Sequence, residues 1–170
     1  MQFKITEIKQ FKFSKTHFYS IKFLDRGKSE FKDFYERMQQ NDVDYKEVLE
    51  IINWFSDWAN YEGALEDFFR EEREADRLFQ PMEFTIKDDD QIEPNLGLRC
   101  YCYRLNQNVV ILFNGGRKTQ QDPEKCDNVR DYFLQAIAIS KVLDEAFHYG
   151  NLYIENDFEL KTKPNSFLKI

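Results

Sequence analysis

The segment Val109–Phe113 (VVILF) constrains the fold of this chain more than any other stretch. Every side chain in it is apolar, and a strand alternates its side chains between two faces, so both faces of this strand must be covered. Asn106 and Gln107 precede it at the position of a hairpin turn. The sequence therefore predicts a hairpin whose second strand is central in a sheet. On the first strand, one face carries Leu98, Cys100 and Cys102, and the other carries Arg99, Tyr101 and Tyr103.

Periodicity along the rest of the chain predicts an α+β fold. Runs of strands and runs of helices follow one another, which favours an antiparallel sheet packed against helices over alternating β-α-β units. The predicted elements are strands over 2–13 and 17–24, helices that begin at the N-caps Ser29 and Asp44, a third helix over 64–79, a strand over 82–87, an acidic loop over 88–97 and a last helix over 129–148.

The length of the chain suits one domain, because 170 residues can bury a sizeable core. We expect residues 1–150 to form a single α+β domain with an extra N-terminal strand or hairpin. Residues 151–170 then hold either a final C-terminal strand, within NLYIENDFEL, or a loose tail.

Composition and charge exclude several classes of protein. Apolar residues make up 42 % of the chain and aromatic residues 16 %, which is too much for a disordered chain. No apolar run approaches the length of a membrane span, and the N-terminus lacks the apolar core of a signal peptide, so a cytoplasmic protein without a membrane partner is expected. The net charge is −7, but residues 41–95 hold seventeen acidic residues against five basic ones. A local basic patch elsewhere stays possible.

The three cysteines predict no metal centre. Their number is odd, and the chain lacks an export signal, which favours reduced thiols. Cys100 and Cys102 lie two residues apart on one strand face, without further thiolates at ligand spacing. We interpret them as small buried hydrophobic residues, and nothing in the sequence indicates a cofactor.

The hairpin pairing places a cation at the rim of the sheet. With the turn at Asn106 and Gln107, Arg104 pairs with Val109 and Arg99 lies opposite Asn114. Two glycines then carry the chain past the same end of the sheet, and glycine leaves the backbone open to a ligand.

Three cations are therefore expected to meet at that rim: Arg99, Arg117 and Lys118, with Tyr101 and Tyr103 on the adjacent face. Cations beside aromatic rings suit a phosphodiester backbone and a stacked base. An ordinary solvated strand exit, in which Arg99 pairs with an acidic helix, explains the same residues. The segment GGRKT lacks the glycine spacing of a phosphate-binding loop.

The stretch LRCYCYRLNQNVVILFNGGRKT, followed by a polar loop and the helical VRDYFLQAIAISKVLDEAF, resembles the RelE/ParE/HigB-like toxin superfamily. In that family, helices precede antiparallel strands, the last strand is apolar, a glycine or basic step follows, and a helix ends the domain. The resemblance covers about residues 17–148, and Leu98–Thr119 is its most specific part. It implies a RelE-like fold.

The resemblance also implies a function: the toxin of a type II toxin–antitoxin-like system, neutralised by an antitoxin protein. Ribosome-associated members are endoribonucleases that cleave mRNA by attack of a 2′-hydroxyl on the adjacent phosphate. Mapped by position, Arg99, Arg117 and Lys118 would clamp the phosphate, and Tyr101 or Tyr103 would stack a base or assist proton transfer. Family RNases are small and basic, whereas this chain is long and acidic. A gyrase inhibitor and a non-catalytic protein-interaction module on the same fold are therefore alternatives.

Overall fold

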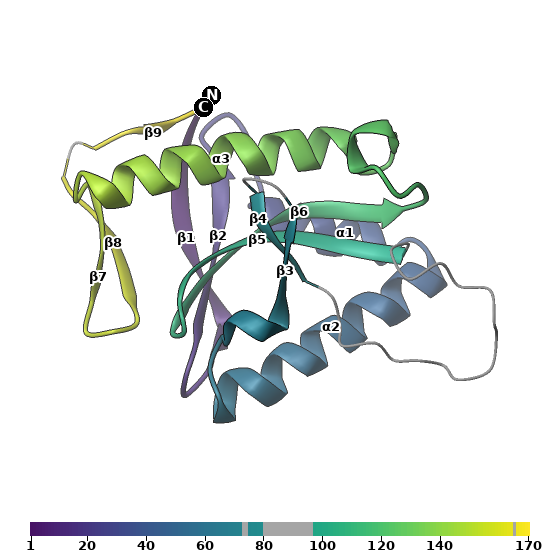
Figure 1. Ribbon diagram of the computed structural model, residues 1–170, viewed down its shortest axis with the longest axis horizontal. Helices are drawn as coiled ribbons and strands as arrows, with labels where there is room; N and C mark the ends of the chain where they lie inside the picture. Colours follow the sequence, from purple (N-terminus) through teal and green to yellow (C-terminus); the bar gives the residue numbers. More distant parts are fainter. Residues whose placement is uncertain (73–74, 80–96, 165) are drawn as a thin grey trace.

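A computed structural model describes residues 1–72, 75–79, 97–164 and 166–170 of the chain, and its architecture is α+β, as predicted (Figure 1). The N-terminal hairpin of β1 (Gln2–Lys12) and β2 (His17–Phe23) leads into α1 (Glu30–Met38) and α2 (Asp42–Tyr61). The later elements are η1 (Glu66–Phe68), β3 (Phe69–Glu72), β4 (Ala75–Phe79), β5 (Gly97–Asn106), β6 (Val109–Lys118), η2 (Pro123–Lys125), α3 (Arg130–His148), β7 (Leu152–Glu155), β8 (Glu159–Thr162) and β9 (Leu168–Lys169).

The main sheet has seven strands in the order β3-β4-β5-β6-β2-β1-β9, and it is mixed. The expectation of a purely antiparallel sheet is wrong at one place, since β2 runs parallel to β6, with Phe18 beside Val110. The physical reason is that β2 is buried along almost its whole length. Its second edge therefore requires a partner strand, and the central strand β6 supplies it.

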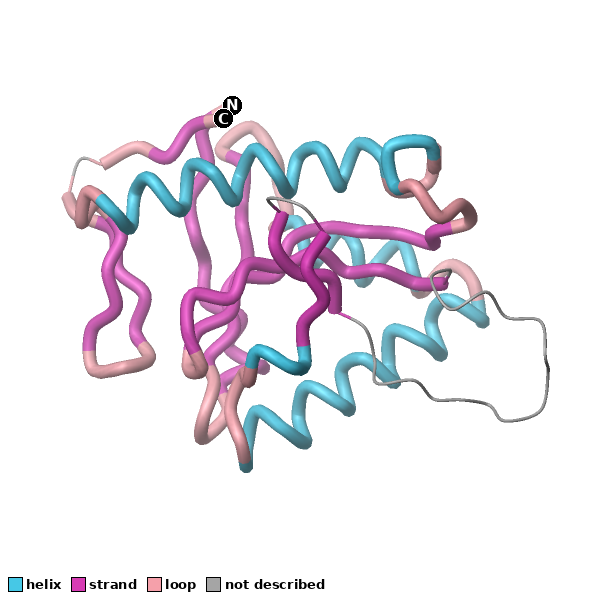
Figure 2. The backbone as a smooth tube through the Cα atoms, in the orientation of Figure 1, coloured by secondary structure: helices cyan, strands magenta, loops and turns pink. Residues whose placement is uncertain are grey.

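Helices cover the sheet on both sides, with α1 and α2 on one side and α3 on the other (Figure 2). The alternation of β6 divides its side chains between the two cores, as predicted. Val110 and Leu112 pack with α1 and α2, whereas Ile111 and Phe113 pack with α3. The prediction of a central strand covered on both faces is confirmed.

The turn between β5 and β6 shifts the predicted register. The strands end at Asn106 and begin again at Val109, and the Asn106 Oδ1 accepts hydrogen bonds from the backbone N–H of Asn108 (2.8 Å) and of Val109 (2.9 Å). This side-chain turn moves the pairing by one residue, so Arg104 lies opposite Val110 rather than Val109. A second irregularity, between Cys100 and Cys102, moves the pairing by one more residue, so Arg99 lies opposite Gly116 rather than Asn114.

The predicted third helix over 64–79 is wrong. The segment forms the short η1 and then β3 and β4, with β4 paired to β5. The rings of Phe68 and Phe69 lie 5.4 Å and 6.1 Å from the ring of Trp58. Pairing with β5 and packing on α2 outweigh the local helical spacing of the apolar residues. The predicted strand over 82–87 and nearly all of the loop over 88–97 lie outside the described residues.

α1 and α2 each begin at a side-chain cap, whereas the N-cap of α3, Val129, makes no side-chain cap hydrogen bond. Ser29 caps α1 as predicted, and its hydroxyl accepts a hydrogen bond from the N–H of Lys32. The predicted cap Asp44 is wrong, because α2 starts earlier. Asn41 is the N-cap, and its side chain accepts from the N–H groups of Val43 and Asp44. The predicted last helix is confirmed as α3.

The C-terminal residues form two strand pairs. β7 and β8 make a separate hairpin whose turn holds Asn156 and Asp157 at positive φ, a conformation that suits these residues. β9 adds to the main sheet, with Leu168 beside Phe3 of β1. None of the helices in the described part of the chain combines the length and apolar character needed to cross a membrane.

Candidate functional site

The structure separates the three cations that the sequence was expected to bring together. β6 continues through both glycines as far as Lys118, which pairs with Gly97 of β5. Adjacent residues of a strand point to opposite faces, so Arg117 and Lys118 diverge. The expectation that both of them meet Arg99 in one pocket is wrong.

The two glycines keep β6 in close contact with its neighbours. A Cβ atom at Gly115 would lie 2.0 Å from the carbonyl oxygen of Arg99, and one at Gly116 would lie 2.7 Å from that of Asn128. Only glycine fits such distances. The glycine pair therefore serves backbone packing against β5 and the loop before α3, and it does not end the strand.

Arg117 faces α2 and is bound by two carboxylates. Its Nε donates to Asp44 at 2.6 Å, and its Nη2 donates to Glu47 at 2.8 Å. Burial would lower the pKa of Arg117, but the hydrogen bonds to Glu47 and Asp44 outweigh it and raise that pKa. The positive charge of Arg117 is therefore neutralised within the fold.

Arg99 and Lys118 share the opposite face of the sheet. Arg99 lies opposite Gly116, and Lys118 lies opposite Gly97, so the two cations are neighbours across β5 and β6. Their side chains are only 4 % and 3 % exposed, and the Arg99 Nη1 donates to the carbonyl oxygen of Leu98 at 2.9 Å. These two cations are brought together, but below the surface.

The two tyrosines lie on the face that packs against α3. Tyr101 is fully buried, and its ring centroid lies 5.6 Å from that of Phe133. The hydroxyl of Tyr103 is hydrogen-bonded to the carboxylate of Asp144. Tyr101 is therefore a core residue that a nucleobase cannot reach, and Tyr103 is hydrogen-bonded to α3.

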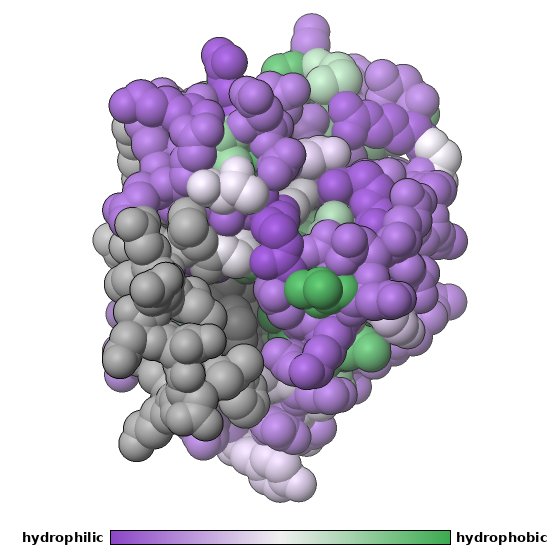
Figure 3. All heavy atoms as spheres, turned by 90° about the vertical axis from the view of Figure 1, so that its right-hand side faces the viewer, coloured by the Kyte–Doolittle hydropathy of each residue, from purple (hydrophilic) through white to green (hydrophobic). Residues whose placement is uncertain are grey.

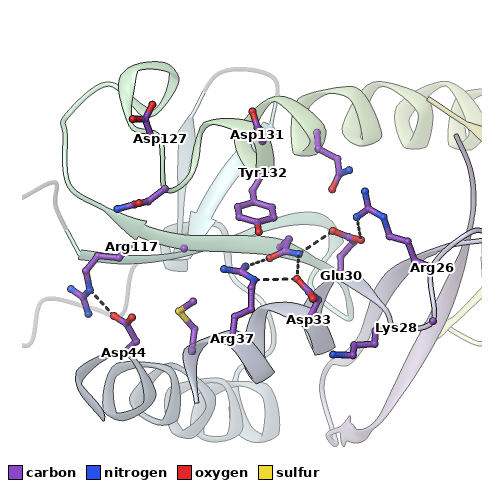
Figure 4. Close-up of a pocket in the computed structure, with 16 residues that line it drawn as sticks. Arg26, Lys28, Glu30, Asp33, Arg37, Asp44, Arg117, Asp127, Asp131 and Tyr132 are labelled. Atoms are coloured by element: carbon purple, nitrogen blue, oxygen red, sulfur yellow. Dashed lines mark hydrogen bonds and ion pairs between the residues drawn. The ribbon is translucent and has the colours of Figure 1, made fainter. Parts of the chain in front are cut away.

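A polar cleft with a volume of about 1010 Å³ lies between α1, the end of β6 and the start of α3 (Figure 4). Figure 3 shows this end of the molecule, where the surface of the described residues is mainly hydrophilic. Carboxylates outnumber cations on the cleft wall, so the wall does not concentrate anions. Its charged residues are Arg26, Lys28, Arg37 and Arg117, with Glu30, Asp33, Asp44, Asp127 and Asp131.

Asn114 is the centre of a buried polar network on the cleft wall. It is 2 % exposed, and its Nδ2 donates to Glu30 at 3.0 Å and to Asp33 at 3.1 Å. Its Oδ1 accepts from Arg37 and from the backbone N–H of Gly115. One amide of β6 thus links the strand to three charged residues of α1, and it fixes the helix on the sheet.

Arg37 completes this network from α1. It donates through Nε to Asp33 at 3.1 Å and through Nη2 to the carbonyl oxygen of Gly115 at 2.8 Å, and its guanidinium lies 4.5 Å from the ring centre of Tyr132 on α3. Burial would raise the pKa of Asp33, but the hydrogen bonds from Asn114 and Arg37 outweigh it and lower that pKa. The network therefore joins three elements and holds Asp33 in its charged form.

Sequence reasoning missed this network, although two signals point to it. Asn114 is a polar residue at the end of an apolar strand, and a buried amide requires hydrogen-bond partners. Glu30, Asp33 and Arg37 lie three and four residues apart, which places them on one face of a helix. The partners themselves could not be predicted, because they come from a distant part of the chain.

No family model, no curated protein and no solved structure matches this chain.

Proposed function

We propose that this protein is the toxin-type component of a type II toxin–antitoxin-like system, and that it acts by binding a partner protein rather than by cleaving RNA. The observation that carries the proposal is that two of the predicted catalytic residues are not available to a substrate. Arg117 is neutralised by Asp44 and Glu47, and Tyr101 is fully buried. An RNA-cleaving site needs these groups at the surface, facing a phosphate.

The order of elements supports the toxin-type assignment. β2 is followed by the helices α1 and α2, by the short η1, by the antiparallel strands β3, β4, β5 and β6, and by α3. This is the order that the resemblance of the sequence to RelE-like toxins implies. The N-terminal β1 lies outside that pattern, and β9 pairs with only Gln2 and Phe3 on its outer edge.

The test is induced expression in a bacterial host, with growth, plasmid topology and the 5′ ends of cellular transcripts measured from the same cultures. We expect slower growth with intact transcripts, and a change in plasmid supercoiling would indicate gyrase as the partner protein. Unaffected growth would refute the toxin-type assignment. Transcript cleavage that depends on Lys118 would refute the proposal that the protein does not cleave RNA.

A ribosome-associated mRNA endonuclease is the second candidate, with mRNA as substrate. The observation that favours it is that Arg99 and Lys118 are neighbours on one face of the sheet. In this case the wild-type protein cleaves transcripts and Lys118→Met abolishes cleavage. Lys125→Met is the matched control, because the side chain of Lys125 is 76 % exposed and lies in η2.

A further inference from the structure

We infer that the outer edge of β1, together with the apolar groove beside it, binds an extended, acidic segment of a partner protein that adds to the sheet as a strand. This inference rests on the proposed function as a protein-binding molecule, and it names the chemistry of the partner.

The outer edge of β1 is open along most of its length. β9 covers only Gln2 and Phe3, and among the residues that the structure describes no strand lies beside Lys4–Lys12 on that side. An open edge presents backbone N–H and C=O groups that pair with an added strand. β9 itself shows that this edge accepts an antiparallel strand. Lys4–Lys12 is longer than an average strand, so the edge has room for a complete one.

An apolar groove runs beside this edge, between β1, α1 and α2. Its volume is about 530 Å³. Side chains of an added strand alternate between two faces, so every second side chain would point toward α1 and α2 and meet the groove. The apolar residues of the groove wall are Ile8, Phe11, Phe31, Tyr35, Leu49 and Ile52.

The groove is accessible from solvent, and it is not a sealed part of the core. Leu49 is 37 % exposed, and Ile8, Phe11 and Ile52 are half-buried at the margin of the α1–α2 core. Burying such apolar area against a partner provides the favourable free energy of docking.

The charge of the edge selects the partner. Three lysines and one glutamate lie on β1, and the glutamate, Glu7, is within 3.5 Å of Lys12. The exposed Lys4 and Lys9 therefore leave the edge positive on a protein of net charge −7. A second copy of this chain would bring lysines against lysines, which disfavours self-pairing. A strand that carries Asp or Glu beside apolar residues complements both the edge and the groove.

The experiment uses the full chain and two synthetic peptides, acetyl-EVEIEVEIE-amide and acetyl-KVKIKVKIK-amide. Fluorescence anisotropy measures the affinity of labelled peptide, and hydrogen exchange measures protection of the backbone amides. We expect the acidic peptide to bind about tenfold or more tightly than the basic one, to protect amides of Lys4–Lys12, and to lose affinity as salt is raised.

Matched variants locate the binding site. Lys9→Glu changes only an exposed edge charge and Ile8→Asp places a charge in the groove, and each should weaken the acidic peptide about tenfold. Lys125→Glu, a charge reversal far along the chain in η2, should not change the affinity. Circular dichroism of each variant confirms that it is folded.

Three results would overturn the inference: no binding of the acidic peptide, equal binding of both peptides, or binding that Lys9→Glu leaves unchanged. A dimer in sedimentation that Ile8→Asp dissociates would also overturn it, because the edge would then bind a second copy. These outcomes concern only the partner and its site. The growth and transcript measurements test the proposed function separately.

Discussion

Replacing Asn114 by alanine should destabilise the protein by about 3 kcal/mol. Two of its hydrogen bonds end on carboxylates, and such a bond is worth about 1.5–3 kcal/mol. Glu30 is 1 % exposed, so water cannot replace its lost bond, whereas the Asp33 side chain is 40 % exposed and water replaces most of that one. The N–H of Gly115 also loses its acceptor, at about 1 kcal/mol. Arg37 also loses a bond, but its side chain is 31 % exposed and keeps its bonds to Asp33 and the Gly115 carbonyl, so water replaces most of that loss. The bond to Glu30 and the orphaned N–H therefore give the total.

Urea unfolding followed by circular dichroism measures this loss as a lower midpoint with an unchanged slope. In a Glu30→Ala background the same substitution should cost about 1–2 kcal/mol less, because the buried carboxylate that Asn114 satisfies is gone. Asn128→Ala, at an exposed asparagine of the same cleft, is the control and should change the free energy of unfolding by less than about 0.5 kcal/mol. A cost for Asn114→Ala below about 1 kcal/mol, or equal costs in both backgrounds, would refute the network as the link between α1 and β6.

Four further predictions concern single residues. Arg117→Ala leaves two carboxylates of α2 facing each other and should cost about 1 kcal/mol in urea unfolding; unchanged stability would contradict a structural role. Tyr101→Phe keeps the buried ring and should leave growth and transcripts as in the wild type, and a lost growth effect would indicate a catalytic tyrosine. Because the pKa of Asp33 is lowered in the fold, its charged form stabilises the protein above the unfolded pKa of about 3.9, and this stabilisation is lost as the pH falls through and below that value. Urea midpoints measured between about pH 6 and pH 3 should therefore decline, and they should decline less in Asp33→Asn. The buried Oγ of Ser140 has no hydrogen-bond partner in the described part of the chain, so Ser140→Ala should raise the free energy of unfolding by up to about 1 kcal/mol, and a lower urea midpoint would argue against this.

Local sequence patterns correctly predicted the elements that depend only on their own residues and on near neighbours in the chain. The run VVILF needs cover on both faces wherever it lies, and it became the central strand β6. Ser29 caps α1 because its hydroxyl reaches an N–H only three residues away. Such interactions depend on the order of neighbouring residues, so they can be read without knowing the rest of the fold.

Elements that depend on distant partners could not be predicted in the same way. The apolar spacing of Leu65, Phe68 and Phe69 fits a helix, but the open edge of β5 and the ring of Trp58 favour an extended chain. The parallel pairing of β2 with β6 also joins segments about ninety residues apart, and no local signal specifies it. In the site, the error was to end the strand at the glycines. Because β6 continues, the alternation of side chains separates Arg117 from its neighbour.

The fold explains part of the uneven charge of the sequence. Three acidic residues of the middle segment face cations of the β5–β6 hairpin: Asp44 and Glu47 bind Arg117, and Glu66 lies 3.3 Å from Arg104. Of the two adjacent cations at the end of β6, Arg117 is therefore explained by its ion pairs with Asp44 and Glu47 of α2. The basic side chains that stay exposed include those of the β1 edge. Electrostatic attraction of a partner therefore belongs to the N-terminal edge rather than to the strand exit, which is why we place the partner's acidic segment on β1.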